Sequence, residues 1–141
     1  MSDTIKLHYT VSPDDFTRAG EASGDVKSKL KKMGVSPEAV RKVAIAMYEG
    51  EINMVIHADG GDIDVEISED DITMILADKG PGIADVEKAM QAGWSTAPDN
   101  IRSLGFGAGM GLPNMKKYSD ALNISSVLGE GTTVEIIIHL T

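Results

Sequence analysis

Glycine alternates with other residues immediately before a helical segment, and this pattern leaves few folds open to the chain. The stretch reads Gly105-Phe106-Gly107-Ala108-Gly109-Met110-Gly111-Leu112. Successive backbone N–H groups in such a loop, with the positive end of the helix that follows, form an anion site. The spacing does not fit the dinucleotide-binding pattern, and no Gly-Lys-Ser/Thr follows as in a P-loop. A flexible hinge is the alternative interpretation.

Polar side chains also recur along one face of a predicted helix. Glu49, Asn53 and His57 are four residues apart, so they lie above one another on that face. Gly50 stands inside the same helix, where glycine costs about 1 kcal/mol relative to alanine. We therefore expect another part of the chain to approach the helix closely there. Glu51 points off the Glu49 face and receives no role; the alternative for the face is a solvated polar surface.

Two further glycine motifs occur at strand ends. Asp78-x-Gly80-x-Gly82 directly follows an apolar strand, where the glycines allow a tight turn and close approach. Gly129-Glu130-Gly131-Thr132-Thr133 opens the last strand. Alone, each is consistent with an ordinary turn.

Periodicity predicts a single α+β domain over residues 1–141. The pattern indicates a two-layer α/β sandwich with helices on one face of a mixed sheet. The expected strands cover residues 5–11, 62–68, 72–77, 122–128 and 132–140. The expected helices cover residues 14–33, closed by Gly34, then 36–57 after a Ser36-Pro37-Glu38 start, 84–92 and 112–121. Residues 93–110 have no strong periodicity, and such long loops in compact domains are usually functional.

Composition excludes several classes of protein. The chain has no cysteine, so disulfides and thiolate metal sites are excluded. Its net charge of -9 argues against a nucleic-acid partner, which needs a basic surface. The apolar runs are too short to cross a bilayer, and the start lacks a signal peptide, so we expect no membrane partner and a cytoplasmic location. Backbone amides and a metal ion would have to hold any phosphate.

Taken together and in this order, the motifs resemble those of the GHKL ATP-binding family, which includes gyrase, Hsp90, histidine kinases and MutL. The resemblance covers roughly residues 36–140. It consists of Glu49-x-x-x-Asn53, Asp78-x-Gly80-x-Gly82, the glycine stretch from Gly105 to Leu112, and Gly131-Thr132. Within the family, the chain looks like the stand-alone serine/threonine kinases of the bacterial anti-sigma and switch-kinase group. Residues 92–96, before the glycine stretch, look closest to the switch kinases.

The resemblance implies a role for each motif, with ATP and Mg²⁺ as cofactors. Asp78 would accept the adenine amino hydrogen, with Gly80 and Gly82 allowing close approach and Thr132 supporting that end. Asn53 would ligate Mg²⁺, and Glu49 would be the general base. Amides of the glycine stretch would hold the phosphates, from Gly107 through Ala108, Gly109, Met110 and Gly111 to Leu112.

The expected activity is ATP-dependent phosphorylation of a serine or threonine on a small antagonist protein in a bacterial partner-switching pathway. The alternative is a nucleotide-gated binding module that sequesters a sigma factor or another partner with little catalysis. Glu49 favours the kinase, because binding alone does not require a base. The sequence leaves open whether a sigma factor binds and whether the protein forms a homodimer.

Overall fold

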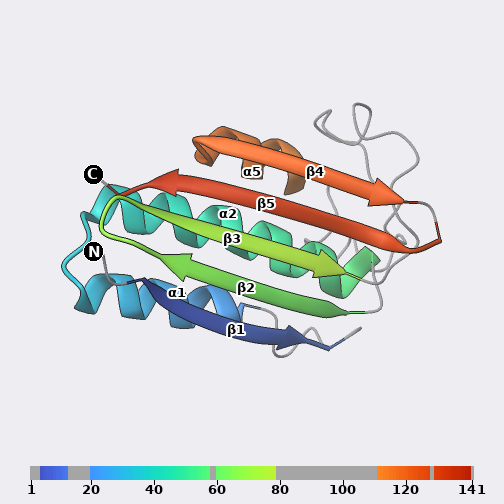
Figure 1. Cartoon of the computed structure of the whole chain (residues 1–141), viewed down its shortest axis with the longest axis horizontal. Coiled ribbons are helices and arrows are strands. Elements are labelled where there is room, and N and C mark those ends of the chain that lie inside the picture. The colour runs from blue at the N-terminus through green and yellow to red at the C-terminus, as the bar shows by residue number, and fades with distance from the viewer. Residues whose placement is uncertain (1–3, 13–19, 58–59, 79–110, 128, 141) are drawn as a thin grey trace, which may run out of the picture.

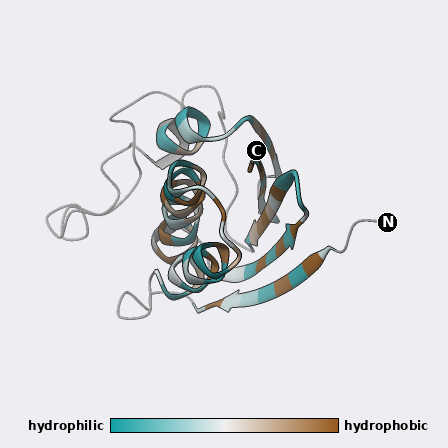
Figure 2. Cartoon of the chain, turned by 90° about the vertical axis from the view of Figure 1, so that its left-hand side faces the viewer, coloured by the Kyte–Doolittle hydropathy of each residue, from teal (hydrophilic) through white to brown (hydrophobic). Residues whose placement is uncertain are grey.

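In the part of the chain that the structure describes, five strands and three helices form two layers (Figure 1). The computed structural model describes residues 4–12, 20–57, 60–78, 111–127 and 129–140. The strands are β1 (Ile5–Val11), β2 (Gly61–Ile67), β3 (Asp71–Asp78), β4 (Ala121–Val127) and β5 (Gly131–His139). The helices are α1 (Glu21–Lys32), α2 (Pro37–His57) and α5 (Gly111–Tyr118). Seen from the side in Figure 2, the helices lie on one face of the sheet, which confirms the α+β sandwich.

The sheet has the strand order β1-β2-β3-β5-β4, and its pairing corrects one expectation. All four pairings between the described strands are antiparallel, so the predicted mixed sheet is wrong. The reason is that two helices connect β1 to β2. A short connection from Lys32 to Pro37 reverses the chain between α1 and α2, so the chain enters β2 opposite to β1 (Figure 1).

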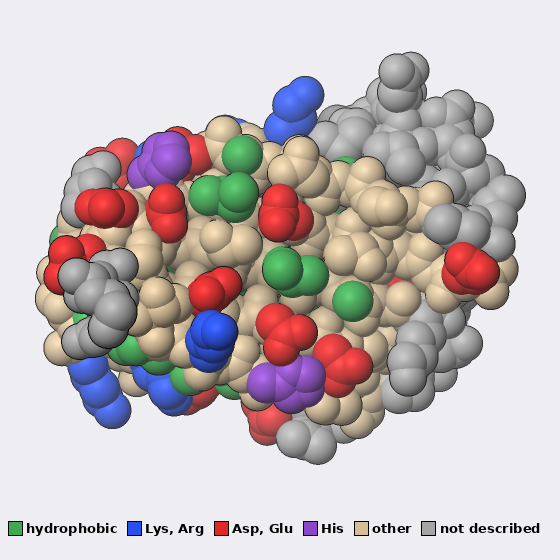
Figure 3. Space-filling model, in the orientation of Figure 1, with side chains coloured by type: hydrophobic (Ala, Val, Ile, Leu, Met, Phe, Trp, Pro, Cys, Tyr) green, Lys and Arg blue, Asp and Glu red, His purple; other side chains and the backbone are tan. Residues whose placement is uncertain are grey.

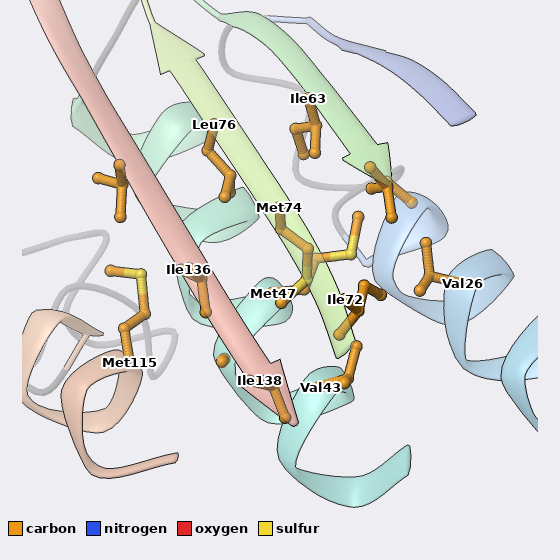
Figure 4. Close-up of a cluster of buried hydrophobic side chains, with 14 of the residues drawn as sticks. Val26, Val43, Met47, Ile63, Ile72, Met74, Leu76, Met115, Ile136 and Ile138 are labelled. Atoms are coloured by element: carbon orange, nitrogen blue, oxygen red, sulfur yellow. The ribbon is translucent and has the colours of Figure 1, made fainter. Parts of the chain in front are cut away.

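Alternation along the strands sends apolar side chains toward the helices. Ile63, Leu76 and Val134 are direct neighbours across β2, β3 and β5 and are at most 8% exposed. The inner side chains of the sheet meet Val43 and Met47 of α2, as Figure 4 shows. The core therefore lies between the central strands and α2, and fixes that helix over the middle of the sheet.

The helix ends follow from local sequence. Ser36 Oγ accepts a hydrogen bond from Ala39 N at 3.3 Å, which confirms the start of α2. After α1, Gly34 has a φ of 80°, and Val35 N donates to Leu30 O at 3.1 Å, which confirms the glycine cap. Helix α1 begins at Glu21; the earlier part of the predicted 14–33 helix, and the predicted 84–92 helix, lie outside the described residues.

The glycine inside α2 lies where the helix meets the sheet and α5. A Cβ at Gly50 would lie 2.5 Å from Leu76 Cδ2 and 3.4 Å from Met115 Sδ. Any larger residue would have to displace one of these buried side chains. The close approach that we expected at Gly50 is therefore confirmed, and it brings α2, β3 and α5 together next to Glu49.

Candidate nucleotide site

The sequence-predicted residues that the structure describes come from elements that meet at one end of the sheet. Figure 1 shows the end of α2, the end of β3 and the start of β5 at the same end of the molecule. A Cβ at Gly61 would lie 2.7 Å from Met54 Cε, and Gly61 pairs with Asp78 across β2 and β3. The last turns of α2 therefore lie over the strand ends that carry Asp78.

Asp78 and Thr132 lie together, as the sequence predicts. The backbone N–H of Thr132 donates to Asp78 Oδ1 at 3.0 Å. This contact requires glycine at position 131, where φ is 137° and a Cβ would lie 2.1 Å from the Asp78 carbonyl oxygen. Gly131 thus allows β5 to approach the end of β3, and that approach orients the Asp78 carboxylate.

Ser126 completes this end of the site and is absent from the sequence prediction. Its hydroxyl lies 2.8 Å from the hydroxyl of Thr132, which is 6% exposed. Ser126 and Thr132 are direct neighbours in the β4–β5 pairing. The Gly129-Glu130 turn is the sequence signal that could have found Ser126. A hairpin about this turn can place Ser126 opposite Thr132, but the sequence alone does not determine that register.

Glu49 lies on the side of α2 that faces α5. Its Oε1 accepts a hydrogen bond from the side-chain amide of Asn114 at 3.2 Å. Both side chains are half-buried. Burial raises the pKa of the Glu49 carboxyl above its usual value, and the Asn114 bond opposes that shift. Asn114 is not among the sequence-predicted residues, although it lies one helical turn after Gly111, the last glycine of the motif.

Asn53 is half-buried one turn after Glu49, as predicted. The structure also places Gly111 at the first residue of α5 and Leu112 in its first turn. Other predicted site residues lie outside the described residues, namely Gly80, Gly82, Gly105, Gly107, Ala108, Gly109 and Met110. Within the described ranges, no group of three or more His, Asp or Glu side chains is placed to hold a metal ion.

Glu51 points away from Glu49, as expected, but it has a structural role that the sequence analysis did not assign. Its two carboxylate oxygens accept backbone hydrogen bonds from Ala22 and Ser23, at 3.2 and 3.1 Å. Glu51 is 3% exposed, and the positive end of α1 offsets its charge. A hollow of about 510 Å³ lies beside it, lined by residues of β1 and the first turns of α1, among them Tyr9, Glu21 and Asp25.

The fold and this site define a class of protein. The GHKL resemblance predicts a two-layer sandwich with Asp78 at a strand end, Thr132 beside it, and Glu49 and Asn53 on one helix, and the structure has this arrangement. Residues 13–138 match the family described as the histidine kinase-like ATPase domain. The chain belongs to this family, and ATP is the nucleotide that the family's description names.

Several characterised relatives are similar to this chain. Serine/threonine-protein kinase RsbT of Bacillus subtilis is 32% identical over 115 residues, which span 79% of this chain and 80% of that protein. An anti-sigma F factor of Anoxybacillus flavithermus is 38% identical over 107 residues, spanning 76% of this chain and 66% of that one. An anti-sigma F factor of Clostridium beijerinckii is 37% identical over 105 residues and 70% of each chain.

A solved structure shares the fold. The crystal structure of the RsbU and RsbW domains of Rv1364c from Mycobacterium tuberculosis matches 96% of this chain with a TM-score of 0.66 and 15% sequence identity. The match covers 32% of that longer chain. Among the described residues, no helix is long and apolar enough to span a membrane.

Proposed function

We propose that this protein is an ATP-dependent serine/threonine kinase whose substrate is a small antagonist protein in a bacterial partner-switching pathway. Family membership and the kinase and anti-sigma names of the relatives support this proposal. The observation that carries it is Glu49, a half-buried carboxylate held by Asn114 on the helix that follows the glycine motif. Nucleotide binding alone does not require a base there.

The residues present fit ATP and Mg²⁺. Gly131 brings β5 so close to Asp78 that a Cβ there would clash with the Asp78 carbonyl oxygen, and Thr132 presents a buried hydroxyl at the same place. Asp78 would accept the adenine amino hydrogen, and the Asn53 amide oxygen would be a magnesium ligand. Backbone amides from position 107 to Leu112 would hold the phosphates at the start of α5.

The proposed chemistry requires little covalent participation by the protein. Bound Mg-ATP would supply the γ-phosphoryl group, with ADP as the leaving group, and its Mg²⁺ would neutralise charge that develops during transfer. Glu49 takes the proton from the attacking serine or threonine hydroxyl of the partner. The partner is a small protein with a phosphorylatable side chain. A sigma factor is a further proposed partner, in line with the anti-sigma relatives, and a homodimer is proposed separately.

Glu49→Gln tests the catalytic assignment. The glutamine oxygen still accepts the Asn114 bond, so ATP affinity measured by calorimetry should be unchanged. Transfer of label from ATP to a protein acceptor recovered from a lysate should fall about 10²–10⁴-fold, as is typical when a general base is lost. Because burial raises the pKa of Glu49, the acid limb of the wild-type rate profile should lie above pH 4.5, the ordinary glutamate value.

Two results decide between the proposed kinase and the alternative. If Glu49→Gln transfers phosphate as fast as wild type, Glu49 is not the base. If wild type binds ATP and a partner but labels no acceptor, the nucleotide-gated binding module replaces the kinase. The feature that favours that module is the set of anti-sigma F factors among the relatives.

A further inference from the structure

A side-chain hydrogen bond joins the proposed base to the helix that follows the glycine motif. Asn114 Nδ2 donates to Glu49 Oε1 across 3.2 Å, between residues 65 positions apart in sequence. Asn114 stands three residues after Gly111, where α5 begins. The bond therefore links the element that ends the glycine motif to the residue that would remove the proton.

Backbone packing sets the separation of this pair. Gly50, the residue after Glu49, lies against Met115, the residue after Asn114, with 3.4 Å between a built Cβ and the sulfur. Met115 is 1% exposed and belongs to the main core, where Figure 4 shows it beside the central strands. Because the neighbours of both residues are packed tightly, α2 and α5 hold the two side chains within reach of each other.

We infer that Asn114 is a positioning residue that fixes the Glu49 carboxylate for proton removal. The amide occupies Oε1 and thereby orients Oε2, the atom that takes the hydroxyl proton. An amide donor also stabilises the charged carboxylate, which burial disfavours. This inference rests on the proposed kinase function. It adds to the proposed site a residue that lies outside the sequence motifs.

The chain contains a comparable pair that serves as a control. Asn123 donates to Glu135 Oε1 at 3.0 Å, between neighbouring positions of β4 and β5. That pair lies on the face of the sheet opposite the helices, and its contact is exposed to solvent. It has the same chemistry as the Asn114–Glu49 pair, and it lies away from the helices that carry the proposed base.

The experiment compares Asn114→Ala, Asn114→Gln and Asn123→Ala with wild type. The probe is labelled Mg-ATP with the protein acceptor recovered as above, and kcat, the KM for ATP and the urea midpoint are measured for each. Asn114→Ala should lower kcat roughly 10–100-fold, the loss expected for a hydrogen bond to a charged group. The KM for ATP should change less than threefold, by roughly 0.6 kcal/mol or less. Asn114→Gln keeps the donor and should recover part of kcat, while Asn123→Ala should match wild type.

The outcomes separate this inference from the function on which it rests. Wild type that labels no acceptor overturns the kinase and the role of Asn114 with it. Wild type that is active, with Asn114→Ala equally fast, overturns only the role of Asn114. If Asn114→Ala and Asn114→Gln lose kcat and urea stability together and to the same degree, Asn114 serves packing, and the inference is wrong.

Discussion

At the end of the sheet where we propose that ATP binds, single residues act through the backbone as much as through their side chains. Gly131 lets β5 come so close to β3 that the Thr132 amide reaches Asp78 Oδ1. The carboxylate is then held by a backbone donor. On the neighbouring strand, the Ser126 hydroxyl lies 2.8 Å from the Thr132 hydroxyl. Adenine recognition at this end would therefore rest on a preorganised set of groups.

Asp78→Asn tests that recognition at the residue scale. The asparagine oxygen can still accept the Thr132 amide, so the fold should be unaffected, but the variant lacks a carboxylate to accept the adenine amino hydrogen. ATP affinity measured by calorimetry should fall about 10–100-fold, as expected for a lost bond to a charged acceptor. Asp64→Asn, on β2 beside His8, is the matched control and should bind as wild type. Unchanged affinity in Asp78→Asn would refute the adenine assignment.

The sequence could predict which residues form much of the candidate site, but it could not predict most of the contacts that they make. Asp78, Thr132, Glu49 and Asn53 could be chosen from motifs because their spacing is local. Asn114 and Ser126 could not, because each acts through a partner on another element, and those pairings depend on packing and strand register. The same holds for Glu51, whose role becomes visible only when the first turn of α1 is seen against it.

At the scale of elements, α2 joins the site to the rest of the fold. Three consecutive residues contact three different elements: Glu49 bonds to α5, Gly50 packs on β3 and α5, and Glu51 caps α1. The sequence predicted the extent of α2 and the close approach at its glycine. It could not predict that α1 would begin against this helix, because the capping carboxylate is 28 residues away from Ser23 in sequence.

Glu51→Ala should destabilise the protein through α1. The substitution removes two hydrogen bonds from a buried carboxylate and leaves the Ala22 and Ser23 amides without that acceptor. We expect the free energy of unfolding to fall by about 2–4 kcal/mol. Urea denaturation would measure this loss, and Glu66→Ala on the exposed face of β2 should stay within about 0.5 kcal/mol of wild type. A loss no larger than the control's would show that the cap contributes little.

At the scale of the whole molecule, the two faces of the sheet differ in character. One face is covered by the helices, while the other carries acidic side chains among scattered apolar ones, as Figure 3 shows. His8 bonds there to Asp64 at 2.7 Å and lies 3.3 Å from Asp62, and the Asp64 bond raises the pKa of the histidine. This arrangement suits a solvated surface, and the nucleotide site that we propose lies instead at the end of the sheet, where α2, β3 and β5 meet.

Nucleotide binding should stabilise the whole domain, since α2, β3 and β5 all carry proposed contacts and belong to one core. A ligand that binds only the folded state adds about 2.7 kcal/mol at 100 times its Kd. For a domain of this size, that addition should raise Tm by several degrees. Mg-ATP should therefore shift the melting curve of wild type and of Glu49→Gln equally, because the base contributes nothing to binding. Asp78→Asn at the same nucleotide concentration should show about half of that shift or less, because its affinity is expected to fall about 10–100-fold. An equal shift in all three proteins would place the bound nucleotide away from Asp78, whereas no shift in wild type at millimolar Mg-ATP would refute nucleotide binding at this site.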